Sequence, residues 1–223
     1  METLSIESRL LFRDALMLVI NKPAGIPVHK GTGGGDTLEQ HFHHLQFGLP
    51  RPPALAHRLD RDTSGCLILG RNRHALASLS KLFAAGRIQK TYLAIVEGKP
   101  DKPGGVIDLP LEKKFEHKAR WHMQVAPHGS GVPCETHYTL LASRNGKSLL
   151  QLSPQTGRTH QLRVHCAAMG WPIVGDKLYG TADDQLMLHA SAVTVPLYAG
   201  KQPITVMAPL PSYMQADGLP LRV

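Results

Sequence analysis

Short apolar runs separated by polar, glycine-rich or proline-containing segments recur along the chain, and this pattern predicts more strands than helices. The first run, residues 16–21, ends at Lys22-Pro23 and is followed by a glycine-rich segment. Residues 137–143 and 148–153 flank Asn145-Gly146, which favours a hairpin because both central positions of a type I′ turn need positive φ. The remaining predicted strands are residues 55–59, 66–70, 92–96, 186–193 and 204–208.

Helical periodicity is limited to a few segments. The clearest lies between Asn72, a favoured N-cap residue, and Gly86, a natural stop. Asp36 or Thr37 can cap a second helix, and Thr159 can cap a third over residues 160–169. Because the strands connect mainly through turns, we expect an α+β fold with a mixed, mainly antiparallel central sheet flanked by helices and loops.

The length of 223 residues predicts a single domain spanning residues 1–223. Residues 98–110 contain repeated proline and glycine, and residues 112–131 are polar and basic without a clean period. Long segments of this kind in compact domains are usually functional or disordered. We therefore expect a basic loop insertion at about residues 110–133.

The chain has 25 Lys and Arg against 17 Asp and Glu, a formal net charge of +8, so an anionic partner is plausible. Its three cysteines, Cys66, Cys134 and Cys166, show no CxxC spacing, which indicates neither a disulfide framework nor a zinc site and suits a reducing cytoplasm. No apolar run approaches the roughly 20 residues that span a bilayer. The chain is therefore expected in the cytoplasm, with no membrane partner, and as a monomer.

A cluster of histidines, His41, His43 and His44, is the strongest suggestion of a metal site. Positions i, i+2 and i+3 of a helix do not converge well on one ion, and no acidic or cysteine ligand lies nearby in the sequence. We expect no metal site.

Residues 57–65, HRLDRDTSG, place the carboxylate of Asp60 among cations at the end of an apolar run. Neighbouring positive charge keeps an aspartate ionised, and an ionised aspartate can act as a covalent nucleophile. The alternative is a solvated turn in which Asp60 or Asp62 caps backbone amides.

Residues 157–165, GRTHQLRVH, place His160 and Arg163 three positions apart, on one face of the expected helix. Near a helix N-terminus, Arg163 can hold a carboxylate or a phosphate. The alternative is an ordinary structural ion pair. Tyr92, the one aromatic residue in an aliphatic strand, can stack on a base or transfer a proton, or can simply pack in the core.

Residues 112–122 interleave basic and aromatic side chains. Cations pair with phosphates and rings stack on unpaired bases, so this composition suits RNA, although a charged surface loop without a ligand has the same composition. The residues expected to contact RNA here are Lys113, Lys114, Lys118, Arg120 and Trp121.

Taken in order, these segments resemble the RluA branch of the pseudouridine synthases, which convert uridine to pseudouridine in RNA. The resemblance covers nearly the whole chain. It is carried by residues 19–25 (VINKPAG), 57–65 (HRLDRDTSG), 90–92 (KTY), 157–165 (GRTHQLRVH), 172–180 (PIVGDKLYG) and 188–190 (LHA). The second and fourth of these, in this order, are highly specific.

The resemblance implies that Asp60 is the nucleophile, that Arg163 pairs with it, and that Tyr92 packs on the target base. It also implies that Arg58 enters the gap left by a flipped-out uridine, that Arg158 and His160 contact the substrate, and that the basic loop grips a stem-loop of ribosomal or transfer RNA. No cofactor is expected, since isomerisation needs neither redox chemistry nor activation. No S4-like RNA-binding module is expected either.

Two other functions remain open at this point. Residues 60–64, DRDTS, approach the DxDxT pattern of haloacid-dehalogenase-like phosphatases, which use an aspartyl-phosphate intermediate. Serine occupies the fifth position, however, and the strand pattern does not suit a doubly wound parallel sheet. A non-catalytic RNA-binding protein would explain the charge, but gives no reason for Asp60, Tyr92 and Arg163 to occur together.

Overall fold

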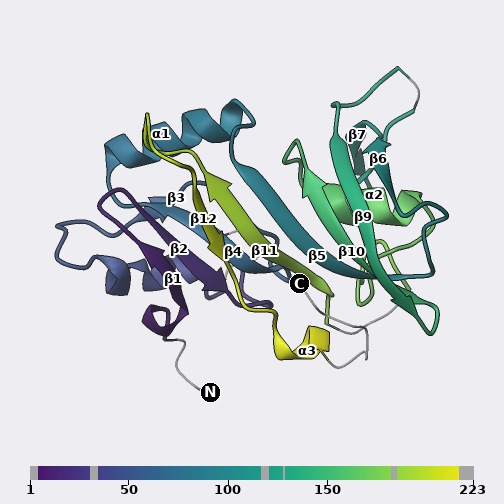
Figure 1. Ribbon diagram of the computed structural model, residues 1–223, viewed down its shortest axis with the longest axis horizontal. Coiled ribbons are helices and arrows are strands. Elements are labelled where there is room, and N and C mark those ends of the chain that lie inside the picture. The colour runs from purple at the N-terminus through teal and green to yellow at the C-terminus, as the bar shows by residue number, and fades with distance from the viewer. Residues whose placement is uncertain (1–4, 31–34, 117–120, 128, 182–184, 216–223) are drawn as a thin grey trace. The chain divides into compact units, whose positions relative to one another are not determined.

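The computed structural model describes residues 5–30, 35–116, 121–127, 129–181 and 185–215. The chain folds as two compact units, residues 1–90 with 190–210 (unit 1) and residues 91–189 with 211–223 (unit 2). Strands β5 (Gln89–Glu97) and β11 (Leu188–Val195) both cross the boundary between the units (Figure 1). At these two places the chain passes from one unit to the other inside a strand, and it passes a third time between β12 and α3, at Leu210–Pro211.

Unit 1 is built on antiparallel strands. Its pairings are β1 (Leu10–Arg13) with β2 (Met17–Lys22), β2 with β4 (Ser64–Gly70), β3 (Ala54–Leu55) with β4, and β11 with β12 (Ile204–Met207). β4 is buried throughout and β2 almost throughout, so both appear in the sequence as continuous apolar runs rather than as alternating ones. Val19, Ile68 and Val193 belong to one core cluster with Leu79 of helix α1 (Arg73–Ala84).

The expected caps of unit 1 are found where the sequence indicated them. The side chain of Asn72 accepts a hydrogen bond from the backbone N–H of Ala75 at 2.8 Å, which confirms it as the N-cap of α1. Thr37 precedes η2 (Leu38–Leu45), and its backbone N–H donates to the Gln40 side chain at 2.9 Å. This second helix is of the 3-10 type, as is the shorter η1 (Glu7–Arg9).

Unit 2 contains an antiparallel sheet in the order β5, β10 (Lys147–Pro154), β9 (Glu135–Arg144) and β6 (Gly104–Asp108). Between β9 and β10, Asn145 and Gly146 have φ of 51° and 74°, so the predicted hairpin turn is confirmed. Helix α2 (Gln161–Ala168) packs Leu162 and Cys166 against the core of this sheet, and the short α3 (Ser212–Gln215) lies near the C-terminus.

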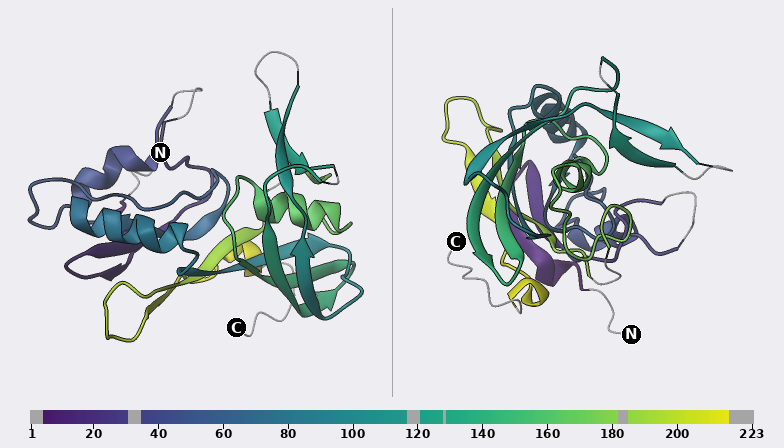
Figure 2. Two further views of the ribbon diagram at one scale, coloured as in Figure 1. Left: turned by 90° about the horizontal axis from the view of Figure 1, so that it is seen from above. Right: turned by 90° about the vertical axis from the view of Figure 1, so that its right-hand side faces the viewer.

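The segment expected as a basic loop is instead a second antiparallel hairpin, β7 (Leu111–Phe115) with β8 (Trp121–Val125). In Figure 2 this hairpin, in teal, extends away from the rest of unit 2. Its strands are partly exposed on both faces, so they lack the inside-outside alternation that identifies a strand in a sequence. Residues 98–110 likewise include strand β6.

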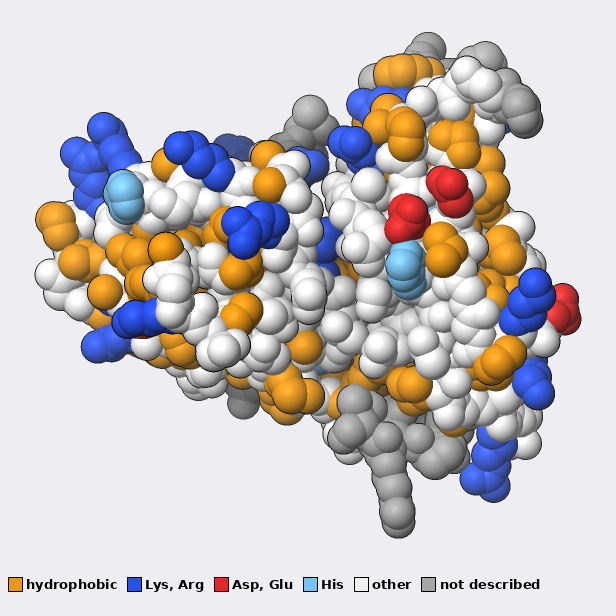
Figure 3. All heavy atoms as spheres, turned by 45° about the horizontal axis from the view of Figure 1, so that its top comes forward, with side chains coloured by type: hydrophobic (Ala, Val, Ile, Leu, Met, Phe, Trp, Pro, Cys, Tyr) orange, Lys and Arg blue, Asp and Glu red, His pale blue; other side chains and the backbone are white. Residues whose placement is uncertain are grey.

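The expected α+β class with a mainly antiparallel sheet is confirmed by these pairings. On the face shown in Figure 3, basic side chains are more frequent than acidic ones, in the same sense as the net charge of +8. Among the described helices, none is both long and apolar enough to cross a membrane.

Candidate active site

The loop that carries Asp60 is anchored at its start by His57. β3 ends at Leu55, so the strand predicted over residues 55–59 is too long. The Nε2 atom of His57 accepts the backbone N–H of Ile68 at 2.9 Å, taking a hydrogen-bonding group that a longer β3 would use. Burial, reinforced by the charge of Lys90, lowers the pKa of His57 to about 3. This histidine is therefore a neutral structural acceptor.

Lys22 holds the middle of the same loop. Its side chain is fully buried, and its ammonium group donates to the carbonyl oxygens of Pro23, Arg61 and Thr63 at 2.7, 2.8 and 2.9 Å. The backbone N–H of Gly25 adds a hydrogen bond to the Arg61 carbonyl at 3.0 Å. An ammonium group has three N–H donors, and all three bind backbone carbonyls here. One carbonyl, that of Pro23, directly follows β2, and the other two lie in the Asp60 loop.

Burial is also the main influence on the charge of Lys22. It lowers the pKa of the lysine to about 7, and the nearby Asp62 and Asp60 carboxylates offset only part of this shift. The role of Lys22 was not expected from its place at the end of the first apolar run. A lysine that directly continues an apolar run is the signal that indicates it.

Asp60 lies in this loop with its side chain partly exposed. Its carbonyl accepts the Thr63 N–H at 3.2 Å, which closes a turn. The loop ends at Gly65, where φ is +106° and an added Cβ would overlap the backbone of Ala190. Only glycine fits there, so the polypeptide is constrained both before and after the carboxylate.

The cations beside Asp60 are exposed. The Arg58 guanidinium lies 3.5 Å from His29 Nε2, and Arg61 forms an ion pair with Asp62 at 3.1 Å. Thus the structure places Asp60 and Arg58 in unit 1, and the other site residues predicted from the sequence belong to unit 2.

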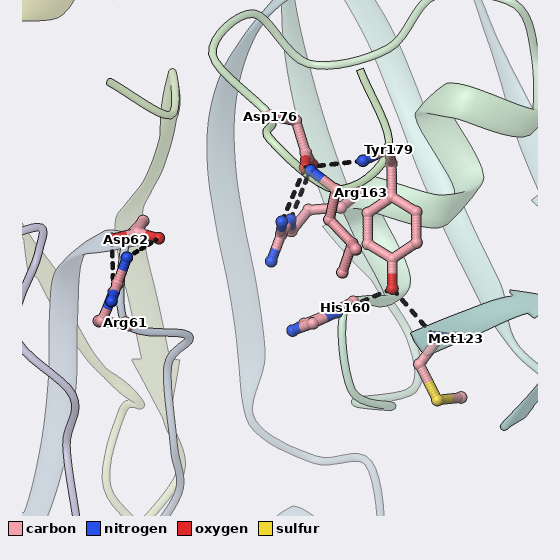
Figure 4. Close-up of polar contacts among 8 residues, drawn as sticks. Arg61, Asp62, Met123, His160, Arg163, Asp176 and Tyr179 are labelled. Carbon is pink, nitrogen blue, oxygen red and sulfur yellow. Dashed lines mark hydrogen bonds and ion pairs between the residues drawn. The ribbon is translucent and has the colours of Figure 1, made fainter. Parts of the chain in front are cut away.

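In unit 2, Arg163 is paired with a carboxylate that sequence analysis did not single out. Its Nε and Nη2 atoms donate to the two carboxylate oxygens of Asp176, each at 2.7 Å, and both residues are buried (Figure 4). Burial alone would raise the pKa of Asp176, but the hydrogen bonds and charge of Arg163 and two backbone amides lower it. The guanidinium is therefore locked in orientation by a permanent ion pair.

Gly175 explains why the chain can bring Asp176 to this position. Its φ is +76°, and an added Cβ would overlap the backbone of Gln185. The Oδ1 atom of Asp176 also accepts the N–H groups of Leu178 and Tyr179 at 2.9 and 3.0 Å. In the sequence, Gly175-Asp176 shortly before the aromatic Tyr179 is the feature that indicates this anchor for Arg163.

His160 takes the position before α2 in a left-handed conformation, with φ of 53°. The prediction that Thr159 caps the helix is therefore wrong. The Gln161 side chain instead organises the approach to the helix, since it accepts the Arg158 N–H at 3.1 Å and donates to the Glu135 carbonyl at 3.0 Å.

Tyr179 connects His160 with the second hairpin. Its hydroxyl is hydrogen-bonded to Nδ1 of His160 at 2.8 Å and accepts the Met123 N–H of β8 at 3.0 Å (Figure 4). Its ring lies 5.2 Å from the Arg163 guanidinium carbon. One tyrosine therefore contacts hairpin, helix start and buried arginine.

The hairpin itself presents basic and aromatic side chains together. Lys113 lies with its ammonium 4.0 Å from the centre of the Trp121 ring, and Phe115, opposite Trp121 in register, is 69% exposed. Lys114 and Arg158 are exposed as well. Lys118 and Arg120 lie outside the described residues.

The third residue predicted to be catalytic, Tyr92, lies in the main sheet of unit 2. It lies in β5 opposite Leu152 of β10 and packs, partly buried, against the core cluster of the sheet. The structure therefore brings together Lys113, Trp121, His160 and Arg163 through a chain of contacts inside unit 2. It places Tyr92 on a different cluster of the same unit.

Within the described parts of the chain, no three His, Cys, Asp or Glu residues are grouped so as to hold a metal ion. His43, from the histidine cluster, is hydrogen-bonded through Nδ1 to the Gln40 carbonyl at 2.8 Å. The chemistry available is thus that of a carboxylate on a constrained loop in unit 1, and of a fixed guanidinium with a cationic, aromatic hairpin in unit 2.

Comparison with known proteins connects these features to one family. Residues 16–168 match the family model described as RNA pseudouridylate synthase. The chain is 46% identical over 208 residues to an uncharacterized RNA pseudouridine synthase of Zymomonas mobilis, covering 91% of this chain and 94% of that protein. It is 37% identical to ribosomal large subunit pseudouridine synthase C of Buchnera aphidicola, covering 83% of this chain and 62% of that protein.

Solved structures are similar over nearly the whole chain. Human RNA pseudouridylate synthase domain containing 4 is 25% identical with a TM-score of 0.79, and the match covers 95% of this chain and 92% of the human one. Human RNA pseudouridylate synthase domain containing 1 is 29% identical with a TM-score of 0.77, covering 94% and 86%.

Proposed function

Because this chain belongs to the RNA pseudouridylate synthase family and is therefore an isomerase of uridine in RNA, we propose that Asp60 is its nucleophile and that its target is a uridine in a stem-loop of ribosomal or transfer RNA. The observation that carries the proposal is the loop around Asp60, whose backbone is tethered by the buried Lys22 ammonium and closed by Gly65. A carboxylate on so constrained a backbone can be aimed before the substrate arrives.

The reaction begins when the Asp60 carboxylate attacks the uridine, either at C1′ of the ribose or at C6 of the base. The bond between N1 and C1′ breaks, the uracil turns, and C5 joins C1′. If Asp60 is bonded to C1′, it leaves as C5 joins that carbon, and if it is bonded to C6, it is eliminated afterwards; the proton on C5 is then removed, while N1 gains one. Atoms and electrons balance without a cofactor, so the protein supplies a nucleophile, orientation and proton transfer.

Arg163 and Tyr92 act on the same uridine in this proposal. Arg163 pairs with the Asp60 carboxylate and orients it, and the ion pair with Asp176 keeps the guanidinium in one orientation. Tyr92 packs on the base and takes the C5 proton. Flipping the uridine out of its stack requires a few kcal/mol, and Arg58 fills the gap that it leaves.

The β7–β8 hairpin grips the RNA. Its cations pair with phosphates, which gives salt-dependent affinity, and the Trp121 ring stacks on an unpaired base, with Arg158 and His160 contacting the same RNA. Replacing both Lys113 and Lys114 by Ala is expected to weaken RNA binding and to flatten its salt dependence by about one unit of slope for each phosphate that is no longer neutralised. The matched control is Lys99→Ala with Lys102→Ala, an equal charge change on an exposed loop of unit 2. Equal effects of the two pairs would contradict the role of the hairpin.

The proposal is tested by digesting RNA treated with purified protein and separating pseudouridine from uridine by chromatography. Wild-type protein is expected to form pseudouridine, and Asp60→Ala to form none while it still binds RNA. Asp62→Ala removes a carboxylate two residues away, one that is paired with Arg61 on the surface, and is expected to keep turnover. Normal product from Asp60→Ala would overturn the assignment. Of the rival functions, neither the phosphatase nor the non-catalytic protein is favoured by the family.

A further inference from the structure

Two aromatic rings from different elements of unit 2 lie close together, and one of them belongs to the last residue pair before the turn of the hairpin, Phe115 with Trp121. Trp121 begins β8, and His160 precedes α2. Their ring centroids lie 6.4 Å apart, and the planes are within 23° of parallel. Trp121 is 40% exposed and His160 is partly exposed, so both rings are accessible from solvent.

Each ring makes a further contact that restrains it. The Lys113 ammonium lies 4.0 Å from the centre of the Trp121 ring, a cation–π contact. His160 is hydrogen-bonded through Nδ1 to the Tyr179 hydroxyl, which also accepts the N–H of Met123, two residues beyond Trp121 in β8. A single hydroxyl group therefore ties together the two elements that carry the rings.

The spacing suits a flat ligand. Rings in direct contact have centroids about 4.5–7 Å apart, so 6.4 Å is near the wide end of that range. Stacked bases repeat at about 3.4 Å, so a base with a ring on each face needs the two rings about 6.8 Å apart. The centroid separation of 6.4 Å is close to that value.

We propose that an unpaired RNA base other than the target uridine inserts between Trp121 and His160. This inference rests on the proposed function, because it takes RNA as the substrate. The target base is assigned to Tyr92, which packs against the core cluster of the main sheet of unit 2. Tyr179 and Met123, which brace the ring pair, pack instead against a separate cluster around Leu111, Cys134 and Val164. Different clusters therefore support Tyr92 and the ring pair, and we take the ring pair as a second site that serves any unpaired base by stacking.

Tryptophan fluorescence gives a direct readout of this site. The chain has two tryptophans, and Trp171 is buried in the core against Tyr138. The variant Trp171→Phe therefore leaves Trp121 as its one indole fluorophore. The probe is a single-stranded oligoadenylate of about eight nucleotides, within the range of site sizes typical for single-strand binding. Because it contains no uridine, the target position of the proposed reaction cannot be occupied by its proper base.

Saturable quenching of Trp121 by oligoadenylate is expected, and none by an abasic ribose-phosphate oligomer of equal length. Equal quenching by the two oligomers would show a phosphate effect alone and would overturn the proposal, as would no quenching by either. Adding Asp60→Ala is expected to leave the quenching unchanged. This variant therefore tests the stacking site independently of the proposed catalytic role of Asp60.

Affinity measurements provide a second test that does not use fluorescence. Trp121→Leu and His160→Asn are each expected to weaken binding of oligoadenylate by about fivefold or more, the lower end for loss of one stacked base, and to leave binding of the abasic oligomer unchanged. Asparagine is chosen at position 160 because it tolerates the left-handed backbone there. Phe115→Leu removes a more exposed ring of the same hairpin and is the matched control. An equal loss of oligoadenylate affinity in Phe115→Leu, or no loss in either test variant, would contradict insertion of a base between Trp121 and His160.

Discussion

Each unit of the molecule contains a buried cation in the region proposed to act on uridine. The two cations differ in the groups that accept their hydrogen bonds. In unit 1, Lys22 donates to three backbone carbonyls. In unit 2, Arg163 binds both oxygens of the Asp176 carboxylate. The lysine can lose its proton, and burial has brought its pKa down to about 7. An arginine stays charged, so the unit 2 pair is permanent while the hold on the Asp60 loop depends on pH.

The largest effect is expected from breaking the pair in unit 2. Asp176→Ala leaves a buried guanidinium without its carboxylate, which typically lowers the free energy of unfolding by about 3–5 kcal/mol. Urea denaturation measures this. Asp62→Ala breaks an arginine pair on the surface of unit 1, where the loss should be less than about 1 kcal/mol. Similar losses of unfolding free energy in the two variants would mean that the buried ion pair contributes no more to stability than the exposed one.

The pH dependence of stability tests the lysine in unit 1. The folded-state pKa of about 7 lies below the ordinary 10.5, so between these values the unfolded chain binds more protons at Lys22 than the folded one. The contribution of this residue to the free energy of unfolding therefore rises with pH across that window, and is lost as pH falls toward 7, with a slope of at most about 1.4 kcal/mol per pH unit. Lys22→Met should lack this rise. Parallel stability curves for wild type and variant would contradict the shifted pKa.

The same substitution should separate turnover from stability. Lys22→Met removes an expensive buried charge together with its three hydrogen bonds, so the change in stability near pH 7 should be small. The carbonyls of Arg61 and Thr63 lose the Lys22 ammonium, however, and only that of Arg61 keeps the N–H of Gly25, so the Asp60 loop shifts. We expect kcat to fall roughly tenfold, since small displacements of a reacting group are costly. An unchanged kcat in single-turnover assays would show that Lys22 does not position the loop.

The smallest effect concerns the connection from Arg163 to the hairpin. Tyr179→Phe keeps the ring beside the guanidinium but removes the hydroxyl that serves His160 and Met123, which should reduce stability by about 1 kcal/mol and RNA affinity a few-fold. Tyr198→Phe in unit 1 deletes a hydroxyl bound to Asp14 and is expected to leave RNA affinity unchanged. Gel-shift titrations of the two variants compare them. Equal RNA affinities of the two variants would show that the Tyr179 hydroxyl has no role in RNA binding.

Local signals in the sequence predicted the elements whose cause is local. The turn at Asn145-Gly146 and the cap at Asn72 depend on the conformational and hydrogen-bonding preferences of the residues themselves, and both are confirmed. The end of β3 could not be predicted in this way. It depends on the His57 ring reaching the Ile68 amide, eleven residues further along the chain.

The candidate site shows the same division. Motifs indicated Asp60 and Arg163, because their residue types and neighbours resemble a family. The residues that hold them in place, Lys22 and Asp176, were not identified, because both act through tertiary contacts. Lys22 binds a residue 39 positions away in sequence, and Asp176 binds one 13 positions away. The hairpin β7–β8 was missed as a strand pair because its residues are partly exposed on both faces.

The most direct test of the central claim is tritium release from RNA labelled at C5 of uridine, measured under single-turnover conditions with Asp60→Asn. Asparagine keeps the size of the side chain but cannot attack as a carboxylate does, so the account predicts RNA binding like that of wild type and no release above the rate without enzyme. Release at the wild-type rate would contradict Asp60 as the nucleophile.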